Sequence, residues 1–117
     1  MKPRFKFDGS VLVMTKDAVF PRTKKAAMRM SIEKWEVVVQ GHKDGIQPIY
    51  SSGGDTCALC HLYIEEQCSQ CPIKKYSKGD LYCNNTPFED YCMNPTLTNA
   101  KKELAFLRMV QKKEGLL

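Results

Sequence analysis

The chain has 117 residues, of which 43% are hydrophobic and 26% are charged. This composition is typical of one folded domain and excludes a wholly disordered chain. Its mean hydropathy is −0.41, and no apolar run approaches the ~20 residues that span a bilayer, which excludes a membrane-spanning segment. Positive charges at the amino terminus are not followed by an apolar stretch, so we expect no signal peptide and a cytoplasmic protein without membrane contact.

The formal net charge of +5 is unevenly distributed along the chain. Lys and Arg outnumber Asp and Glu by ten to five in residues 1–50 and by five to two in residues 94–117. In residues 51–93, six acidic residues face three basic ones. Because nucleic-acid contact needs Lys and Arg near the phosphates, any such contact is expected from the two flanks.

The first 21 residues predict a basic β-hairpin or arm. Phe5-Lys6-Phe7 and Val11-Leu12-Val13 flank Asp8-Gly9-Ser10, and Asp-Gly between short apolar runs indicates a hairpin because the turn needs positive φ. An isolated two-stranded hairpin is marginally stable unless it packs on something. A partly ordered arm is therefore the alternative.

Residues 22–41 predict an amphipathic helix, with Thr23 as the amino-terminal cap and Gly41 at the carboxyl-terminal cap. Trp35 is expected to be a core anchor that faces the cysteine-rich segment. The apolar positions recur at spacings of three and four: Met28, Ile32, Trp35, Val38 and Val39. The charged residues expected elsewhere around the helix are Lys24, Lys25, Arg29, Lys34 and Glu36.

Residues 95–112 predict a second amphipathic helix, capped by Asn94 or Thr96. Its main stripe consists of Leu97, Ala100, Leu104, Leu107 and Gln111, with Val110 beside it. Phe106 and Met109 lie off that stripe. They form a second apolar patch for the hairpin, a partner chain or a copy of the protein itself, so a homodimer is one possibility.

All six cysteines lie between Cys57 and Cys92, within a predicted module of residues 55–92. Two Cys-x-x-Cys pairs, Cys57/Cys60 and Cys68/Cys71, are separated by seven residues, and Cys83 follows eleven residues after the second pair. A Cys-x-x-Cys turn directs two sulfurs to one side, and two such turns complete the tetrahedral site of a structural zinc ion. The spacing therefore predicts structural Zn²⁺.

The predicted metal ligands are Cys57, Cys60, Cys68 and Cys71. The spacer between the pairs is shorter than the ~12 to 20 residues usual between zinc-ligand pairs, so Cys83 is an alternative ligand. His61 is a weaker alternative, because a histidine beside a ligand more often lies outside the metal's own shell. Cys92, in an aromatic context, is expected to be a buried free thiol.

Other uses of the cysteines remain open. Four or five thiolates also hold an iron–sulfur cluster, and an exported protein would use six cysteines as three disulfides. A redox Cys-x-x-Cys normally begins a helix in a βαβ context, which is missing here. Glu65 and Glu66 lie between the pairs without the deaminase signature. A redox or metal enzyme is therefore the least favoured class, and no catalytic residue is predicted.

The order of these features resembles small cysteine-rich proteins of tailed bacteriophages. The matching elements, within about residues 28–110, are Glu33-Lys34-Trp35-Glu36, Cys57-Ala58-Leu59-Cys60, Cys68-Ser69-Gln70-Cys71-Pro72-Ile73, Cys83 before Thr86-Pro87-Phe88 and Tyr91, and Glu103-Leu104-Ala105-Phe106-Leu107. The resemblance implies a phage accessory protein in the bacterial cytoplasm that binds a host or phage protein. It brings no catalytic residues with it.

The sequence thus predicts a small α+β fold of one domain, with an N-terminal β-hairpin and two amphipathic helices packed on a zinc-stabilised cysteine-rich loop module. The favoured function is a non-enzymatic interaction protein with a protein partner. Nucleic-acid binding is the alternative, with Phe5 or Phe7 available for stacking. Its predicted contact residues are Lys2, Arg4, Lys6, Lys16, Arg22, Lys24 and Lys25.

Overall fold

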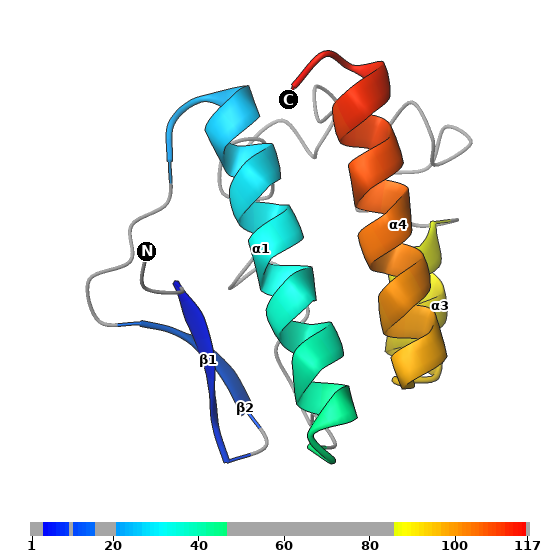
Figure 1. Cartoon of the computed structure of the whole chain (residues 1–117). Coiled ribbons are helices and arrows are strands. Elements are labelled where there is room, and N and C mark those ends of the chain that lie inside the picture. Colours follow the sequence, from blue (N-terminus) through cyan, green and yellow to red (C-terminus); the bar gives the residue numbers. More distant parts are fainter. Residues whose placement is uncertain (1–3, 10, 16–20, 47–85, 117) are drawn as a thin grey trace.

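The structure is a computed structural model, and it describes residues 4–9, 11–15, 21–46 and 86–116. Within these residues it contains two strands and three helices, in the order β1, β2, α1, α3 and α4. Helices α1 and α4 lie side by side in opposite directions, with the β-hairpin on the far side of α1 (Figure 1). The predicted α+β fold is confirmed, as is the hairpin at the amino terminus.

Strands β1 (Phe5–Asp8) and β2 (Val11–Met14) pair antiparallel, with Asp8 opposite Val11 beside the turn. Gly9 has a φ of 65°, a conformation that glycine adopts without the steric cost of a Cβ. Because side chains alternate across a strand, Phe5 and Leu12 reach the core and are 1% and 2% exposed. The hairpin therefore contributes side chains to the core, which contradicts the alternative of a partly ordered arm.

Helix α1 spans Lys24–Lys43, and Thr23 caps it as predicted. The Thr23 Oγ1 accepts a hydrogen bond from the Ala26 N–H at 3.2 Å, which satisfies one of the free donors of the first turn. Trp35 is 3% exposed and belongs to the core, which confirms its role as an anchor.

The predicted cap at Gly41 is wrong, because α1 continues past this residue. Gly41 is buried within the helix, and the Phe7 ring lies where a Cβ at Gly41 would be. Gly45, with φ 86°, ends the helix instead. The Ile46 N–H donates to the Gly41 carbonyl at 2.9 Å and the Gly45 N–H to the His42 carbonyl at 3.1 Å, which is the Schellman arrangement.

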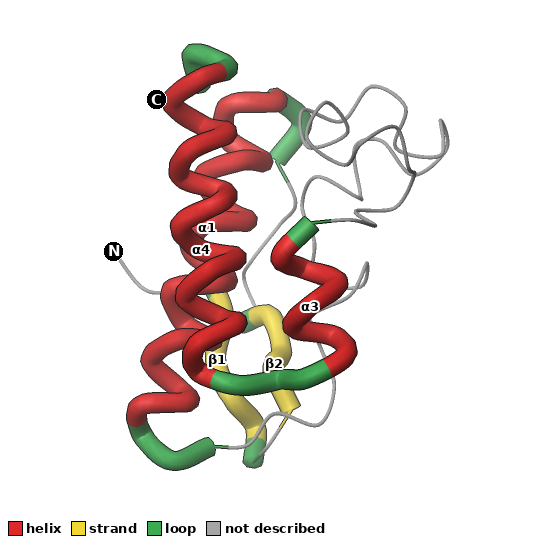
Figure 2. The backbone as a smooth tube through the Cα atoms, turned by 90° about the vertical axis from the view of Figure 1, so that its right-hand side faces the viewer, coloured by secondary structure: helices red, strands yellow, loops and turns green. Residues whose placement is uncertain are grey.

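Helix α3 (Pro87–Met93) was not predicted, and it packs against α4 (Figure 2). Its signals were present in the sequence: Pro87 at the first helical position and Glu89 and Asp90 in the first turn. Seven residues are too few to show a helical apolar period, which is why the pattern analysis missed it.

Helix α4 (Leu97–Lys113) confirms the second predicted helix, with Thr96 as its cap. The Thr96 Oγ1 accepts from the Asn99 N–H at 3.2 Å. The Asn99 side chain donates to the Asn94 carbonyl at 2.9 Å and to the Asp90 carbonyl at 3.3 Å, joining the end of α3 to the start of α4. The core members of α4 are Ala100, Leu104, Leu107 and Val110.

Two charged side chains lie in the interior, which the periodicity did not predict. Lys34, expected on the polar side of α1, is 2% exposed, and Glu103 of α4 is 3% exposed. The reason is that α1 is covered by the hairpin on one side and packs on α4 on another, so its buried surface is wider than one stripe. The Lys34 Nζ lies 5.7 Å from the centre of the Trp35 ring, within the range of a cation–π contact.

Candidate functional site

The predicted metal ligands Cys57, Cys60, Cys68 and Cys71 lie outside the described residues, as do the alternatives Cys83 and His61. Among the residues that the structure describes, no group of three or more His, Cys, Asp and Glu side chains is placed to hold a metal ion. The zinc site therefore stays a prediction from the cysteine spacing. What the structure does show is the part of the chain before and after residues 47–85. We call its strands β1 and β2 and its helices α1, α3 and α4 the framework.

Cys92, the one cysteine among the described residues, is exposed, so the prediction of a buried thiol is wrong. It lies on α3, whose core residue is Tyr91, and the next position along a helix points away from that core. Partial desolvation of the thiol raises its pKa. The charge of Lys34 acts in the opposite direction, while Glu103 and Glu89 add to the rise. Cys92 is thus not poised as a thiolate at neutral pH.

An aromatic cluster joins α1, which precedes residues 47–85, to α3, which follows them. Tyr91 of α3 is 2% exposed, and its ring meets Trp35 of α1 edge to face at 4.9 Å between centroids. Phe88 makes a second edge contact with Trp35 at 6.1 Å. Such aromatic pairs contribute about 0.5–1.5 kcal/mol each beyond the area they bury. The prediction that Trp35 faces the module is confirmed for the module's α3 end.

A hydrogen bond reinforces this connection. The His42 Nε2 and the Tyr91 hydroxyl lie 2.9 Å apart, and the two rings also meet edge to face. Burial lowers the pKa of His42, so the imidazole is neutral at neutral pH. This contact was not predicted from the sequence, because a histidine and a tyrosine 49 positions apart carry no periodic signal.

Arg4 belongs to the structure of the hairpin and not to a free basic surface. Its backbone N–H donates to the Glu33 Oε1 at 2.8 Å, and its guanidinium donates to the Glu33 Oε2 from Nη2 at 2.8 Å and from Nε at 3.1 Å. Burial raises the pKa of Glu33, but the hydrogen bonds and charge of Arg4 outweigh it and lower the pKa overall. This ion pair fastens β1 to α1.

The remaining members of the predicted nucleic-acid set fall into two groups. Lys2 and Lys16 lie outside the described residues, whereas Lys6, Arg22, Lys24 and Lys25 are exposed. Phe5, proposed for base stacking, is buried in the core, and Phe7 packs partly buried against the core. The prediction of stacking is therefore wrong for Phe5, while Phe7 keeps a partly exposed ring.

Comparison with protein-family models, curated proteins and solved structures finds no match to this chain. Within the described part of the chain, none of the helices combines the length and the apolar character needed to cross a membrane.

Proposed function

We propose that this chain is a non-enzymatic, zinc-stabilised interaction protein that binds a protein partner. The observation that carries the proposal is the junction of α1 and α3 through Trp35, His42 and Tyr91. Because of this junction, the helix before residues 47–85 and the helix after them belong to one packed unit, which supports a module closed at both ends. A loop closed in this way costs less entropy to order, and a metal bound within it adds further constraint.

The polar residues of the framework support a structural role for it. Arg4 and Glu33 hold the hairpin on α1, Thr23 and Thr96 cap helices, and Asn99 joins α3 to α4. In this proposal the helices hold the metal-bearing segment, and the two together present the recognition surface. The ligands are Cys57, Cys60, Cys68 and Cys71, with Cys83 as the alternative and His61 as the weaker one.

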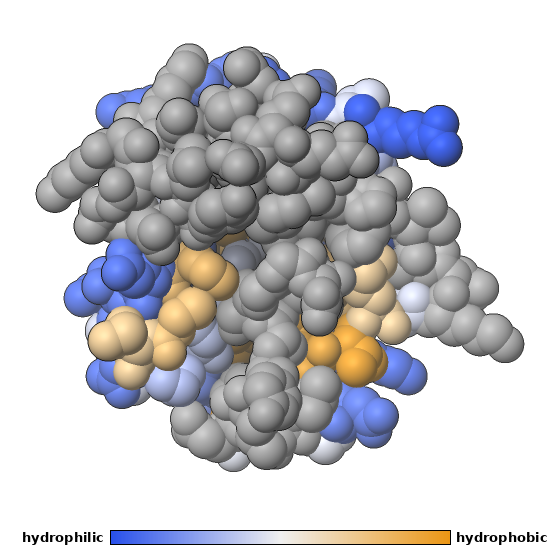
Figure 3. Space-filling model, turned by 180° about the vertical axis from the view of Figure 1, so that it is seen from behind, coloured by the Kyte–Doolittle hydropathy of each residue, from blue (hydrophilic) through white to orange (hydrophobic). Residues whose placement is uncertain are grey.

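Apolar surface on the framework is consistent with a protein partner. Met93 is 82% exposed, and the rear face of the molecule shows described apolar residues in two places, with polar residues along part of each edge (Figure 3). Aromatic residues and methionine are enriched at protein interfaces. The resemblance to phage proteins adds the proposal that the partner is a host or phage protein in the bacterial cytoplasm.

The test is capture of partners from bacterial lysate with the tagged full chain, followed by chemical cross-linking and mass spectrometry. The double variant Cys60→Ser/Cys71→Ser removes two predicted ligands, and Cys92→Ser is the matched control at an exposed position. We expect a partner that the wild type and Cys92→Ser retain and the double variant loses. Zinc-bound, folded protein that recovers no partner would contradict the proposal.

A further inference from the structure

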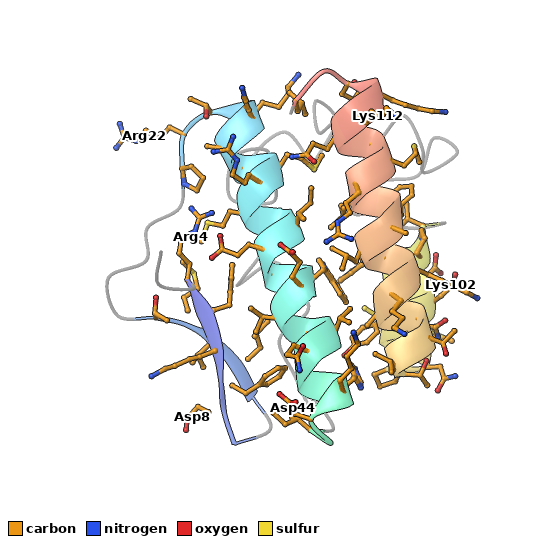
Figure 4. All side chains as sticks on the ribbon, viewed as in Figure 1. Arg4, Asp8, Arg22, Asp44, Lys102 and Lys112 are labelled. Atoms are coloured by element: carbon orange, nitrogen blue, oxygen red, sulfur yellow. The ribbon has the colours of Figure 1, made fainter. Side chains whose placement is uncertain are left out.

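Five exposed cations lie at one end of the α1–α4 pair. Arg22, Lys24 and Lys25 lie at the start of α1, and Lys112 and Lys113 lie in the last turn of α4. The two helices are antiparallel neighbours, so cations nearly 90 positions apart in the sequence come to the same end. Figure 4 shows Arg22 and Lys112 at this end and Asp8 and Asp44 at the opposite end. We call these five residues the basic end.

Two ion pairs among the described residues do not neutralise the basic end. They engage Arg4 with Glu33 and Arg108 with Glu36, and neither pair includes a member of the basic end. Glu114, at the cap of α4, is the carboxylate adjacent to Lys113. Among the described residues, the five cations outnumber this one neighbouring carboxylate, so their summed charge at this end is positive.

The placement of the lysines on α1 does not serve helix stability. The amino terminus of a helix carries a partial positive charge, which favours acidic residues there. The first turn of α1 has no acidic residue and begins with Lys24 and Lys25. The partial positive charge of the helix terminus therefore adds to the charge of the two lysines.

We propose that the basic end binds the phosphate backbone of double-stranded nucleic acid without reading its sequence. Lys and Arg bind a duplex by neutralising phosphates and releasing counterions. Single-stranded binding would require exposed aromatic rings for base stacking. Among the described residues every aromatic side chain is buried or partly buried, so none of these residues presents a fully exposed ring to a single strand, whereas the cations suffice for a duplex. This proposal goes beyond the proposed function and does not depend on zinc.

The basic end differs from the surface predicted from sequence. Arg4 drops out because Glu33 engages it, and Lys112 and Lys113 enter because α4 runs antiparallel to α1. The signal that could have identified them is the basic last turn of the second predicted helix, combined with the expectation that two sequential amphipathic helices pack antiparallel.

The test is fluorescence anisotropy of a labelled 20-base-pair DNA duplex, titrated with the full chain between 50 and 200 mM NaCl. If each of the five cations neutralises one phosphate, affinity falls on the order of a few hundred-fold over this range. The variant Lys112→Gln/Lys113→Gln should lower the salt slope by about two and bind on the order of 10- to 100-fold more weakly at 100 mM salt. The variant Lys24→Gln/Lys25→Gln should lower the salt slope and the affinity by similar amounts.

The matched control is Lys101→Gln/Lys102→Gln, which removes two exposed charges from the first half of the same helix. Figure 4 shows Lys102 well away from Lys112 along α4. This control should bind within about twofold of the wild type. Circular dichroism should show all three variants folded, because each changes exposed residues only.

Three results would overturn the proposal. The first is no duplex binding by the wild type at 50 mM salt. The second is an equal loss of affinity in the control variant. The third is equal or tighter binding of polyglutamate or of single-stranded dT20, which would assign the surface to acidic proteins or to single strands. Failure here leaves the zinc-dependent capture of a protein partner unaffected.

Discussion

At the scale of single residues, Gly41 shows how a side chain far away in sequence decides what a position can hold. A glycine within a helix is about 1 kcal/mol less favourable than alanine. Here the Phe7 ring lies where a Cβ at Gly41 would be. The close approach of the hairpin to α1 therefore explains a glycine that the sequence pattern assigned to a helix end.

We predict that Gly41→Ala destabilises the protein, because Phe7 must move and overpacking of a core costs about 1–3 kcal/mol. Urea denaturation of a double-mutant cycle checks this. In a Phe7→Ala background the same change should instead stabilise the helix by up to about 1 kcal/mol, the ordinary gain from helix propensity. An equal effect of Gly41→Ala in both backgrounds would contradict the contact.

The Arg4–Glu33 pair gives a second prediction at this scale. We expect Glu33→Gln to cost about 1.5–3 kcal/mol at pH 7, the usual value for a hydrogen bond to a charged group. Because the pKa of Glu33 is lowered in the folded state, the stability it provides is present above the unfolded pKa of about 4.3. That stability is lost as the pH falls through the lower folded pKa.

Urea denaturation of wild type and Glu33→Gln between pH 7 and pH 3 measures this effect. The difference in unfolding free energy should shrink as the pH falls below about 4.3. Glu36→Gln is the matched control, since its pair with Arg108 is more than half exposed on both sides and should contribute less than about 1 kcal/mol. A difference for Glu33→Gln that is independent of pH would contradict the account.

At the scale of elements, turn motifs and apolar periods could be predicted from the sequence. A short helix and contacts between residues distant in sequence could not. Turn chemistry at Asp8-Gly9 located the hairpin, and the apolar periods located α1 and α4. The apolar period gives no signal for seven-residue α3, and it placed Lys34 outside the core because burial on several sides of α1 depends on tertiary packing. The contact of Tyr91 with Trp35 joins residues that no local pattern relates.

The docking of α3 provides the prediction at this scale. Tyr91→Ala should cost about 3–5 kcal/mol, the range for removing a large buried aromatic side chain. Tyr91→Phe keeps the ring contact with Trp35 and loses the hydrogen bond to His42, so we expect about 0.5–1.5 kcal/mol. Trp35 is the chain's only tryptophan, and its fluorescence reports the loss of the neighbouring ring.

Both variants can be compared by urea denaturation followed at the Trp35 emission. Emission should shift towards that of a more exposed tryptophan for Tyr91→Ala before denaturant is added, and stay at the wild-type position for Tyr91→Phe. Identical emission for the wild type and Tyr91→Ala would mean that α3 does not cover Trp35 in solution.

At the scale of the whole molecule, we expect different interactions to order the framework and the cysteine-rich segment. The framework has an apolar core of its own, from Phe5 in the hairpin to Val110 in α4. The cysteine spacing predicts that a metal ion organises the segment between α1 and α3. A metal site could be predicted from the sequence because the spacing of the proposed ligands is a local feature. Which four of the five cysteines would bind the metal depends on the fold of the segment, which the spacing does not give.

The most direct test of the zinc-stabilised module is the metal content of the purified full chain, measured by elemental analysis together with thiol titration before and after chelation. We predict one zinc per chain and four thiols that become reactive only when the zinc is removed. Cys92→Ser should keep the zinc, and Cys60→Ser/Cys71→Ser should lose it. Three disulfides without metal, or iron with visible absorbance, would contradict the account.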